Sequence, residues 1–413
     1  MLLPHFRAMG WEVTVLSVEA AEIAAPTDSF LSESLPPDVT IIRVKALSIK
    51  WCRRFGLGNL GWRALPALWR RGNRLLNETQ FSLVYFSTTQ FACFPLGRIW
   101  QRRFRLPYIL DLQDPWVNPY YHGSGAPPPP GGWKYHFAHT FALILEKWTL
   151  RKASHVIAVS PAYLRDLKSR YPWFKGSEHG SVIPFGWSRR DLDAIRRERS
   201  DEPQKEHVAY YGRVGEDMRP LLSWFFRVLK EWQDKLTVPS RLHFHFVGTT
   251  YDQRSNAAGI VTQEANAAGL QDWISEQPER VGFAASLRGL LDSKASLILG
   301  STDLSYTPSK IGPTMAAGRP WLAIVHSNSE AAKRLRVSEA AAEGVFHYDQ
   351  PSDADRLNRW LTNLLTNKFS DISPHPTQAF LDDEAQRLAQ KHVEIFSRYA
   401  VKSPPCPEFS TPA

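Results

Sequence analysis

The sequence predicts an α/β protein built from two doubly wound domains. Short, apolar, β-rich segments recur along the chain with helical segments between them, which is the pattern of βαβ units and parallel sheets. The length of 413 residues is long for one domain and sufficient for two, each with its own hydrophobic core. We therefore expect two parallel sheets, each covered by helices on both faces.

The predicted strands form two series. The first series is Trp11–Val18, Val39–Val44, Phe81–Phe86, Tyr108–Leu112, His155–Val159 and Ser181–Pro184. The second series is His207–Tyr211, Leu242–Val247, Arg280–Phe283, Ser296–Leu299, Trp321–Val325 and Val345–Tyr348. Helices are predicted at Phe137–Leu150, Pro161–Arg170, Leu221–Lys235 and Ser329–Arg336. The charged run Asp191–Lys205 separates the two series and is predicted to link the domains.

The composition is that of a soluble globular protein. Hydrophobic residues make up 43% of the chain and charged residues 22%, and no apolar run reaches the length of a membrane span. The cysteines Cys52, Cys93 and Cys406 are scattered and lack metal-ligand spacing, which favours a reducing compartment. No secretory signal pattern opens the sequence. We expect a cytoplasmic protein.

Positive charge is concentrated in the first domain. The range 43–105 holds thirteen Lys and Arg against one acidic residue, Glu78, and it also contains Trp51, Trp62, Trp69 and Trp100. Basic side chains mixed with Trp and Leu, here around Arg63, are typical of peripheral proteins on anionic membranes. The alternative is a solvated basic helix whose tryptophans belong to the core. Nucleic acid is disfavoured as a partner because no nucleic-acid motif accompanies the charge.

The run from Ser305 to His326 contains a candidate phosphate site. It reads as a loop, a short helix opened by Ser309 and Lys310, a turn at Gly318 and a buried strand. The N-terminus of a helix offers unpaired N–H groups and a positive dipole end, which Lys310 would reinforce. An ordinary connection between a helix and a strand is the alternative.

Glycines follow three predicted strands of the second domain. Gly212 precedes Arg213, with Arg219 nearby; Gly248 precedes Thr249; and Gly282 precedes Phe283. Ligands of open α/β sheets bind beyond the carboxyl ends of the strands, and arginine forks suit a diphosphate. A plain turn explains any one glycine, but together with Lys310 they predict a nucleotide-diphosphate site.

The first domain carries polar residues at two strand ends. Asp114 precedes Pro115 and Trp116, where its carboxylate could orient or deprotonate an acceptor hydroxyl, or simply cap a turn. Ser87 and Thr88 follow another strand with the same ambiguity. The Pro- and Gly-rich segment 118–133 is predicted to be a flap or a disordered excursion. His136 and His139 share a helix face without further ligands, so no metal site is expected.

In order and spacing, several motifs resemble the family 4-like glycosyltransferases of the GT-B fold, two facing Rossmann-like domains. The matching stretches are MGWEVTVLS at Met9–Ser17, LDLQDPW at Leu110–Trp116, SHVIAVS at Ser154–Ser160, VIPFG at Val182–Gly186, YYGR at Tyr210–Arg213 and MAAGRPWLA at Met315–Ala323. The resemblance implies an acceptor-side domain at 1–190, a nucleotide-sugar-binding domain at 191–381 and a helix at 382–400 that crosses back to the first domain. A disordered tail is expected at 401–413.

The resemblance also implies roles for individual residues. Arg213 is the arginine that binds the donor diphosphate, Lys310 lies near the phosphates, and Tyr306 and Ile311 belong to the donor site. The usual second basic residue of the Arg213 loop falls at Met218, which leaves Arg219 as its substitute. Cations and a helix N-terminus stabilise a leaving diphosphate without a metal, so neither cofactor nor metal is expected. Retention of configuration is implied.

The sequence departs from the family pattern at two places. Family members often carry glutamates where this chain has Ser305 and Pro313, so the contacts that hold the donor sugar are unknown. Residues 2–9 read as the end of a first helix and Trp11 opens a second strand, so the first, central strand is missing. The expectation is a true start upstream of Met1.

The predicted function is transfer of a sugar from a nucleotide-diphosphate sugar to a polysaccharide or lipid-linked acceptor. Residues 43–105 would contact the inner face of the plasma membrane. Two alternatives remain open: a nucleotide-sugar epimerase of the same fold, whose acid and base are not evident, and a degenerate nucleotide-binding protein.

Overall fold

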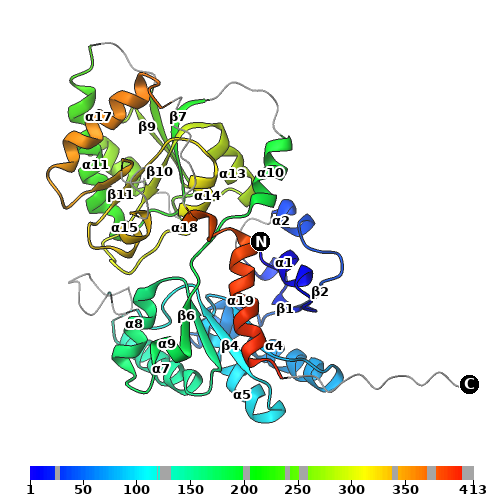
Figure 1. The fold of residues 1–413 in the computed structure, drawn as a ribbon. Coiled ribbons are helices and arrows are strands. Elements are labelled where there is room, and N and C mark those ends of the chain that lie inside the picture. The colour runs from blue at the N-terminus through cyan, green and yellow to red at the C-terminus, as the bar shows by residue number, and fades with distance from the viewer. Residues whose placement is uncertain are drawn as a thin grey trace, which may run out of the picture. The chain divides into compact units, whose positions relative to one another are not determined.

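The computed structural model describes residues 1–23, 28–118, 120, 132–198, 205–237, 242–250, 259–336, 343–369 and 378–401. These residues form two compact units (Figure 1). Unit 1 comprises residues 1–5, 25–37 and 185–388, and unit 2 comprises residues 6–24, 38–184 and 389–413. The predicted tail from 402 onward and most of the predicted flap at 118–133 lie outside the described residues.

Unit 1 contains a six-stranded parallel sheet in the order β12-β11-β10-β7-β8-β9. The strands are β7 (Lys205–Tyr211), β8 (His243–Val247), β9 (Ile274–Gln277), β10 (Ser293–Leu299), β11 (Trp321–Val325) and β12 (Val345–His347). The central strand β10 is buried along its whole length, as expected for a parallel strand covered on both faces. This is the doubly wound arrangement that the sequence predicts.

Helices cover both faces of this sheet (Figure 1). On one face, α11 (Arg219–Gln233), α12 (Ile260–Ala267) and α17 (Asp353–Leu365) enclose a core rich in aromatic side chains, with Phe225, Phe226, Phe244 and Phe246 fully buried. The other helices of unit 1 are α2 (Ser29–Glu33), α10 (Arg189–Glu198), α13 (Phe283–Asp292), α14 (Ile311–Ala316), α15 (Glu330–Leu335) and α18 (Gln378–Leu381), with a 3-10 turn, η3 (Glu216–Met218). Burial of these apolar faces is the main source of stability.

Two predictions in unit 1 are wrong. The strand expected at Arg280–Phe283 is a loop that leads into α13, and the actual strand is β9. The expected linker Asp191–Lys205 begins with α10, whose Leu192 and Ile195 are buried against α13. Residues 191–198 of this run therefore belong to an amphipathic helix inside unit 1.

Unit 2 contains two separate parallel sheets. One pairs β1 (Thr14–Val18) with β2 (Thr40–Val44), and the other has the order β3-β4-β5-β6. The strands of the second sheet are β3 (Val84–Ser87), β4 (Tyr108–Leu112), β5 (His155–Ala158) and β6 (Gly180–Val182). Among the described residues no backbone pairing joins β1 or β2 to β3.

The helices described in unit 2 are α3 (Ile49–Arg54), α4 (Leu60–Glu78), α5 (Pro95–Phe104), α7 (Trp133–Leu150), α8 (Pro161–Arg170) and α9 (Gly176–His179). Helix α1 (Leu3–Ala8) is divided between the two units. Unit 2 also contains two 3-10 turns, η1 (Ala20–Glu22) and η2 (Phe91–Cys93). Strands β4 and β5 are buried along their whole length. No helix formed by the described residues is long and apolar enough to span a bilayer.

The last helix, α19 (Ala385–Tyr399), completes the core of unit 2. The ring of Phe396 lies 5.4 Å from that of Phe6 and 5.0 Å from that of Tyr85, measured between centroids. The ring of Tyr399 lies 5.5 Å from that of His155. The predicted C-terminal helix that returns to the first domain is therefore confirmed.

The basic range 43–105 divides between surface and core. Trp51 and Trp69 are exposed, whereas Trp100 is buried and donates its indole N–H to Asn73. Arg63 is also buried, and its guanidinium pairs with Glu22 at 2.7 Å. For Trp100 the alternative of a core tryptophan therefore holds, and Arg63 also lies inside unit 2, so neither residue is available to a membrane.

Candidate active site

Arg213 follows β7 and is held rigidly. Its two terminal nitrogens each donate to a carboxylate oxygen of Asp217 at 2.8 Å, a bidentate pair. The guanidinium carbon lies 5.6 Å from the centre of the Tyr306 ring, and Tyr210 donates its hydroxyl to the Arg213 carbonyl at 2.7 Å. Asp217 uses two of the five N–H donors of the guanidinium, which leaves three for another anion.

Asp217 is itself anchored by the strand end of β10. Ser301 donates its hydroxyl to Asp217 at 2.7 Å, and Thr302 donates its backbone N–H and its hydroxyl to the Asp217 carbonyl at 2.9 and 3.0 Å. Burial opposes ionisation of Asp217, but the hydrogen bonds and charge of Arg213 outweigh it and lower the pKa of Asp217. The pair is therefore fully ionised.

The glycines after β7 and β8 allow close backbone packing. Gly212 donates its N–H to Val247 at 3.0 Å. Gly248 has φ +74°, and a Cβ atom there would lie 3.5 Å from the Cα atom of Arg280. Thr249 is buried and donates its hydroxyl to Glu276 at 2.5 Å, so its side chain is already engaged. Gly248 and Thr249 therefore shape this edge mainly through their backbone.

Lys310 is the residue directly before α14. Its ammonium lies 6.0 Å from the centre of the Phe283 ring. Burial and, secondly, the charge of Arg280 lower the pKa of Lys310. Among the neighbours, Ser309 is exposed, whereas Ile311 is buried in the apolar core under β11. The predicted short helix after Lys310 is therefore present, and phosphate binding at its start stays a prediction.

Arg280 is a site residue that the sequence reasoning missed. It follows β9, its charge acts on both Lys310 and Tyr210, and the charge of Arg213 also acts on Tyr210. Arg213, Arg280 and Lys310 follow β7, β9 and β10, so all three come after the carboxyl ends of strands of the same parallel sheet. A basic residue three positions after a strand could have signalled Arg280, but the strand was predicted in the wrong place. The arrangement suits a multiply charged anion such as a diphosphate.

Gly282 and Phe283 lie at the start of α13, where a carboxylate already sits. Asp28 accepts a hydrogen bond from the Ala284 N–H at 2.9 Å and another from the Phe30 N–H at 3.0 Å. One carboxylate therefore caps the N-termini of α13 and of α2. A Cβ atom at Gly282 would lie 2.8 Å from the Asp28 carboxylate, which explains the glycine. The predicted donor contact at Gly282 would have to share this position with Asp28.

Arg219 points to a different set of partners. Its guanidinium pairs with Glu216 at 2.8 Å and with Glu264 at 2.5 Å, and it also donates to Gln263 at 3.0 Å. These contacts tie the start of α11 to α12. They favour a structural role, and donor binding by Arg219 stays a prediction.

The positions where family members carry glutamates are occupied differently. Ser305 donates its N–H and hydroxyl to Asp303 at 2.9 and 2.6 Å, and Pro313 is buried inside α14. A second carboxylate, Glu330, is close: its N–H donates to the Leu304 carbonyl at 2.8 Å, and its side chain is 7% exposed. Asp303 and Glu330 are therefore the carboxylates beside this loop.

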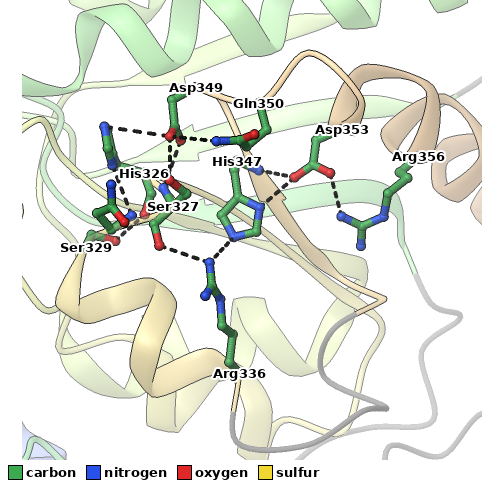
Figure 2. A network of polar contacts seen from close by, with 10 residues as sticks. His326, Ser327, Ser329, Arg336, His347, Asp349, Gln350, Asp353 and Arg356 are labelled. Atoms are coloured by element: carbon green, nitrogen blue, oxygen red, sulfur yellow. Dashed lines mark hydrogen bonds and ion pairs between the residues drawn. The ribbon is translucent and has the colours of Figure 1, made fainter.

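A polar network fixes the neighbouring ends of β11 and β12 (Figure 2). Asp353 accepts from the His347 N–H at 2.6 Å and contacts its Nδ1 at 2.7 Å. Asp349 accepts from the N–H and the hydroxyl of Ser327, and Arg336 donates to the Ser327 carbonyl at 3.0 Å. Because these groups bond one another, the network favours a structural role at the edge of the sheet.

Unit 2 brings polar groups together at the ends of β3 and β4. The buried carboxylate of Asp111 accepts from the hydroxyls of Tyr85 and Ser87, each at 2.9 Å, and from Gln113 at 3.2 Å. Burial, followed by the charge of Asp111, raises the pKa of Tyr85. Asp111 was not predicted as a site residue. Its signal is an acidic residue inside an otherwise apolar strand, which requires polar partners.

The other predicted acceptor-side residues lie beside this cluster in sequence. Asp114 is exposed at the loop after β4, and Trp116 stacks on Phe91 with centroids 5.8 Å apart. Thr88 accepts a hydrogen bond from the Gln90 N–H at 3.0 Å, the ordinary role of a turn residue. Trp116 thus packs inside unit 2, whereas the carboxylate of Asp114 is exposed. Contact of either residue with an acceptor stays a prediction.

No group of three or more His, Cys, Asp or Glu that could hold a metal ion occurs among the described residues.

The first part of the chain matches a known family. Residues 1–175 match the glycosyl transferase 4-like domain, and the match includes the strand-end polar residues of unit 2. The match covers less than half of the chain, and it is to the family that the sequence motifs resemble. No curated protein matches the chain significantly.

Solved structures that cover 94–96% of the chain show that it has the GT-B fold. Sucrose-phosphate synthase from Thermosynechococcus elongatus shares 15% identity at a TM-score of 0.52, covering 96% of this chain and 87% of that one. HepE from Anabaena, in complex with UDP and glucose, shares 14% identity at a TM-score of 0.58, with 94% and 100% covered. A UDP-forming α,α-trehalose-phosphate synthase from Burkholderia xenovorans shares 11% identity at a TM-score of 0.60, with 94% and 99% covered.

Proposed function

We propose that this protein transfers a glycosyl group from a nucleoside-diphosphate sugar to an acceptor hydroxyl. The observation that carries the proposal is the position of Arg213, Arg280 and Lys310, which follow β7, β9 and β10 and so come after the carboxyl ends of strands of one parallel sheet in unit 1. The fixed guanidinium of Arg213 supplies forked donors for the diphosphate. The GT-B fold of the chain supports this role.

In the proposed reaction the bond between the anomeric carbon and the β-phosphate oxygen breaks, and a bond from the anomeric carbon to the acceptor oxygen forms. Negative charge develops on the departing diphosphate, and Arg213 and Lys310 stabilise it in a partly buried setting where their charges are strong. No metal is required for this step in our proposal. The acceptor hydroxyl gives its proton to the departing diphosphate as the new bond forms.

On the acceptor side we assign Asp114 the role of orienting the acceptor hydroxyl, because its carboxylate is exposed at a strand end. Ser87 and Asp111 hold this loop, because both accept a hydrogen bond from the side chain of Gln113. We propose a lipid-linked or polysaccharide acceptor, with retention of anomeric configuration. The buried free thiols Cys52 and Cys93 support a reducing location, the cytoplasm.

Calorimetric titration with nucleoside diphosphates and their sugars tests the donor site. UDP and UDP-glucose are the first probes, followed by the guanine and adenine series. We expect Arg213→Ala and Lys310→Ala each to weaken binding at least about tenfold, since each removes a charged contact to phosphate. Arg227→Ala, an exposed arginine on α11, is the matched control and should bind as wild type does. Binding of no nucleoside diphosphate would overturn the proposal.

A second candidate function, nucleotide binding without transfer, is favoured by one observation. Where glutamates are usual, Ser305 is bonded to Asp303 and Pro313 is buried. Incubation of the protein with a bound nucleotide sugar and a lipid or polysaccharide extract distinguishes the two. Release of nucleoside diphosphate with transfer of labelled sugar supports the transferase, whereas binding without release supports the second candidate.

A further inference from the structure

Helix α7 exposes an apolar stripe on its outer side. Phe137, Phe141, Ile144 and Trp148 recur at helical spacing, and their exposed fractions are 70%, 42%, 59% and 37%. The rings of Phe137 and Phe141 are parallel, with an interplanar angle of 2°. The opposite side of the same helix carries Thr149 and Leu150 into the core of unit 2. A helix that is apolar on its outer side requires a covering partner.

Positive charge borders the C-terminal end of this stripe. The guanidinium of Arg98 lies 4.4 Å from the centre of the Trp148 ring. Arg98, Arg102 and Arg103 of α5, together with Ile99 and Trp148, line an open hollow of ≈ 500 Å³. Arg102 and Arg103 are exposed, and neither forms an ion pair with the described residues. The hollow thus combines guanidinium groups with apolar side chains.

The N-terminal end of the stripe meets α4. The ring of Trp62 lies 5.8 Å from that of Phe141, and Trp69 is exposed about two turns further along α4. Directly before α4, Trp51 of α3 is 67% exposed and Phe55 is 72% exposed. Arg53 and Arg54 stand beside them at the end of α3. Exposed aromatic side chains therefore also occur on α4 and at α3, where basic side chains stand beside them.

We infer that this surface, which we call the α7 surface (Phe137, Phe141, Ile144, Trp148, Arg98, Arg102 and Arg103), docks on an anionic lipid bilayer. Aromatic and aliphatic side chains enter the boundary between headgroups and acyl chains, while arginines bind lipid phosphates. Charge complementarity selects this occupant, because the range 43–105 carries thirteen basic residues and one acidic residue. The inference extends the predicted membrane contact to α7, and it does not depend on the proposed transfer reaction.

Vesicle co-sedimentation tests the electrostatic part. Wild-type protein should bind vesicles of phosphatidylglycerol and phosphatidylcholine at low salt and should not bind phosphatidylcholine alone. Arg102→Gln/Arg103→Gln should weaken binding about 25-fold, because each basic side chain near the surface contributes about 1 kcal/mol. The control Arg227→Gln/Arg359→Gln removes the same charge from exposed positions on α11 and α17 and should bind as wild type does.

A second variant tests the apolar part. Phe141→Ser/Ile144→Ser should weaken vesicle binding at least about tenfold while leaving the salt dependence unchanged. Thermal unfolding and nucleotide titration of each variant establish that the fold and the donor site are intact.

Three outcomes would overturn the inference. One is equal binding of wild-type protein to anionic and neutral vesicles, and another is an equal loss in the charge-matched control. The third is an absence of vesicle binding together with concentration-dependent self-association, which would make the α7 surface a protein interface. If the wild-type protein binds no nucleotide, the proposed function is contradicted and this inference is unaffected.

Discussion

Asp217 holds the guanidinium of Arg213 by two hydrogen bonds of 2.8 Å, and the side chains of the two residues are only 17% and 33% exposed. A pair that is half-buried in this way is costly to break, because the remaining charge lacks a partner. The pair also fixes the plane of the guanidinium before any ligand arrives. The positioning of the proposed phosphate contact therefore depends on a carboxylate.

We predict that Asp217→Asn lowers the free energy of unfolding by about 1–3 kcal/mol. Urea unfolding measures this change. Glu216→Gln is the control: Glu216 pairs with Arg219 in the same loop but is 74% exposed, so its loss should cost less than about 1 kcal/mol. Equal losses in the two variants would contradict a special role for the Arg213–Asp217 pair.

Lys310 should make nucleoside-diphosphate binding depend on pH. In the protein without ligand, burial and the charge of Arg280 lower the pKa of Lys310 below the ordinary lysine value of 10.5. A bound diphosphate should raise this pKa again. Affinity should therefore be highest where free Lys310 is protonated and should fall as pH rises through its lowered pKa. Lys310→Arg, which stays charged, should remove this decline. Titrations in buffers of different ionisation enthalpy would show proton uptake on binding, and its absence would count against the prediction.

His155 should weaken the fold in acid. Burial, and secondly the charge of Arg398, lower the pKa of His155 from 6.5 to about 4, and its neutral ring contacts Ser181 at 2.9 Å. Because the folded-state pKa is lowered, stability is full above pH 6.5 and is lost as pH falls toward 4. The loss is on the order of 3 kcal/mol. His155→Gln should unfold with a flatter pH dependence between these values, and parallel curves would refute the assignment.

Gly72 marks a close contact between α4 and α5. A Cβ atom at Gly72 would lie 2.2 Å from the buried ring of Trp100. Alanine normally favours a helix over glycine, yet overpacking should make Gly72→Ala destabilising by about 1–3 kcal/mol. In thermal unfolding, Gly176→Ala of α9 is the matched control, because nothing lies within 4 Å of its Cβ position. A gain of stability in Gly72→Ala would show that Trp100 moves freely.

Most of the fold was predictable because buried parallel strands are apolar. The error at Arg280–Phe283 has a physical cause: β9 is the edge strand of its sheet, three of its four residues are only partly buried, and its sequence ISEQ is accordingly polar. The apolar loop behind it looked more like a strand. Sequence patterns describe burial, and the edge of a sheet is where burial is least.

The candidate site was predictable only in part. Arg213 and Lys310 were found because they follow strand or loop patterns. The carboxylates Asp217 and Asp28 were not found. Asp217 lies only four residues after Arg213 and was overlooked, whereas Asp28 caps a helix 256 residues away in the chain. The Asp28 pairing arises from tertiary contact and leaves no local signal.

Neither unit is encoded by one continuous stretch of sequence. Unit 2 needs the aromatic side chains of α19 from residue 389 onward, and unit 1 includes residues of α2 near the start of the chain. During synthesis the core of unit 2 stays open until the last helix has left the ribosome. Unit 2 can therefore finish folding only after nearly the whole of unit 1 has been made, so the first half of the gene alone should yield an aggregation-prone product.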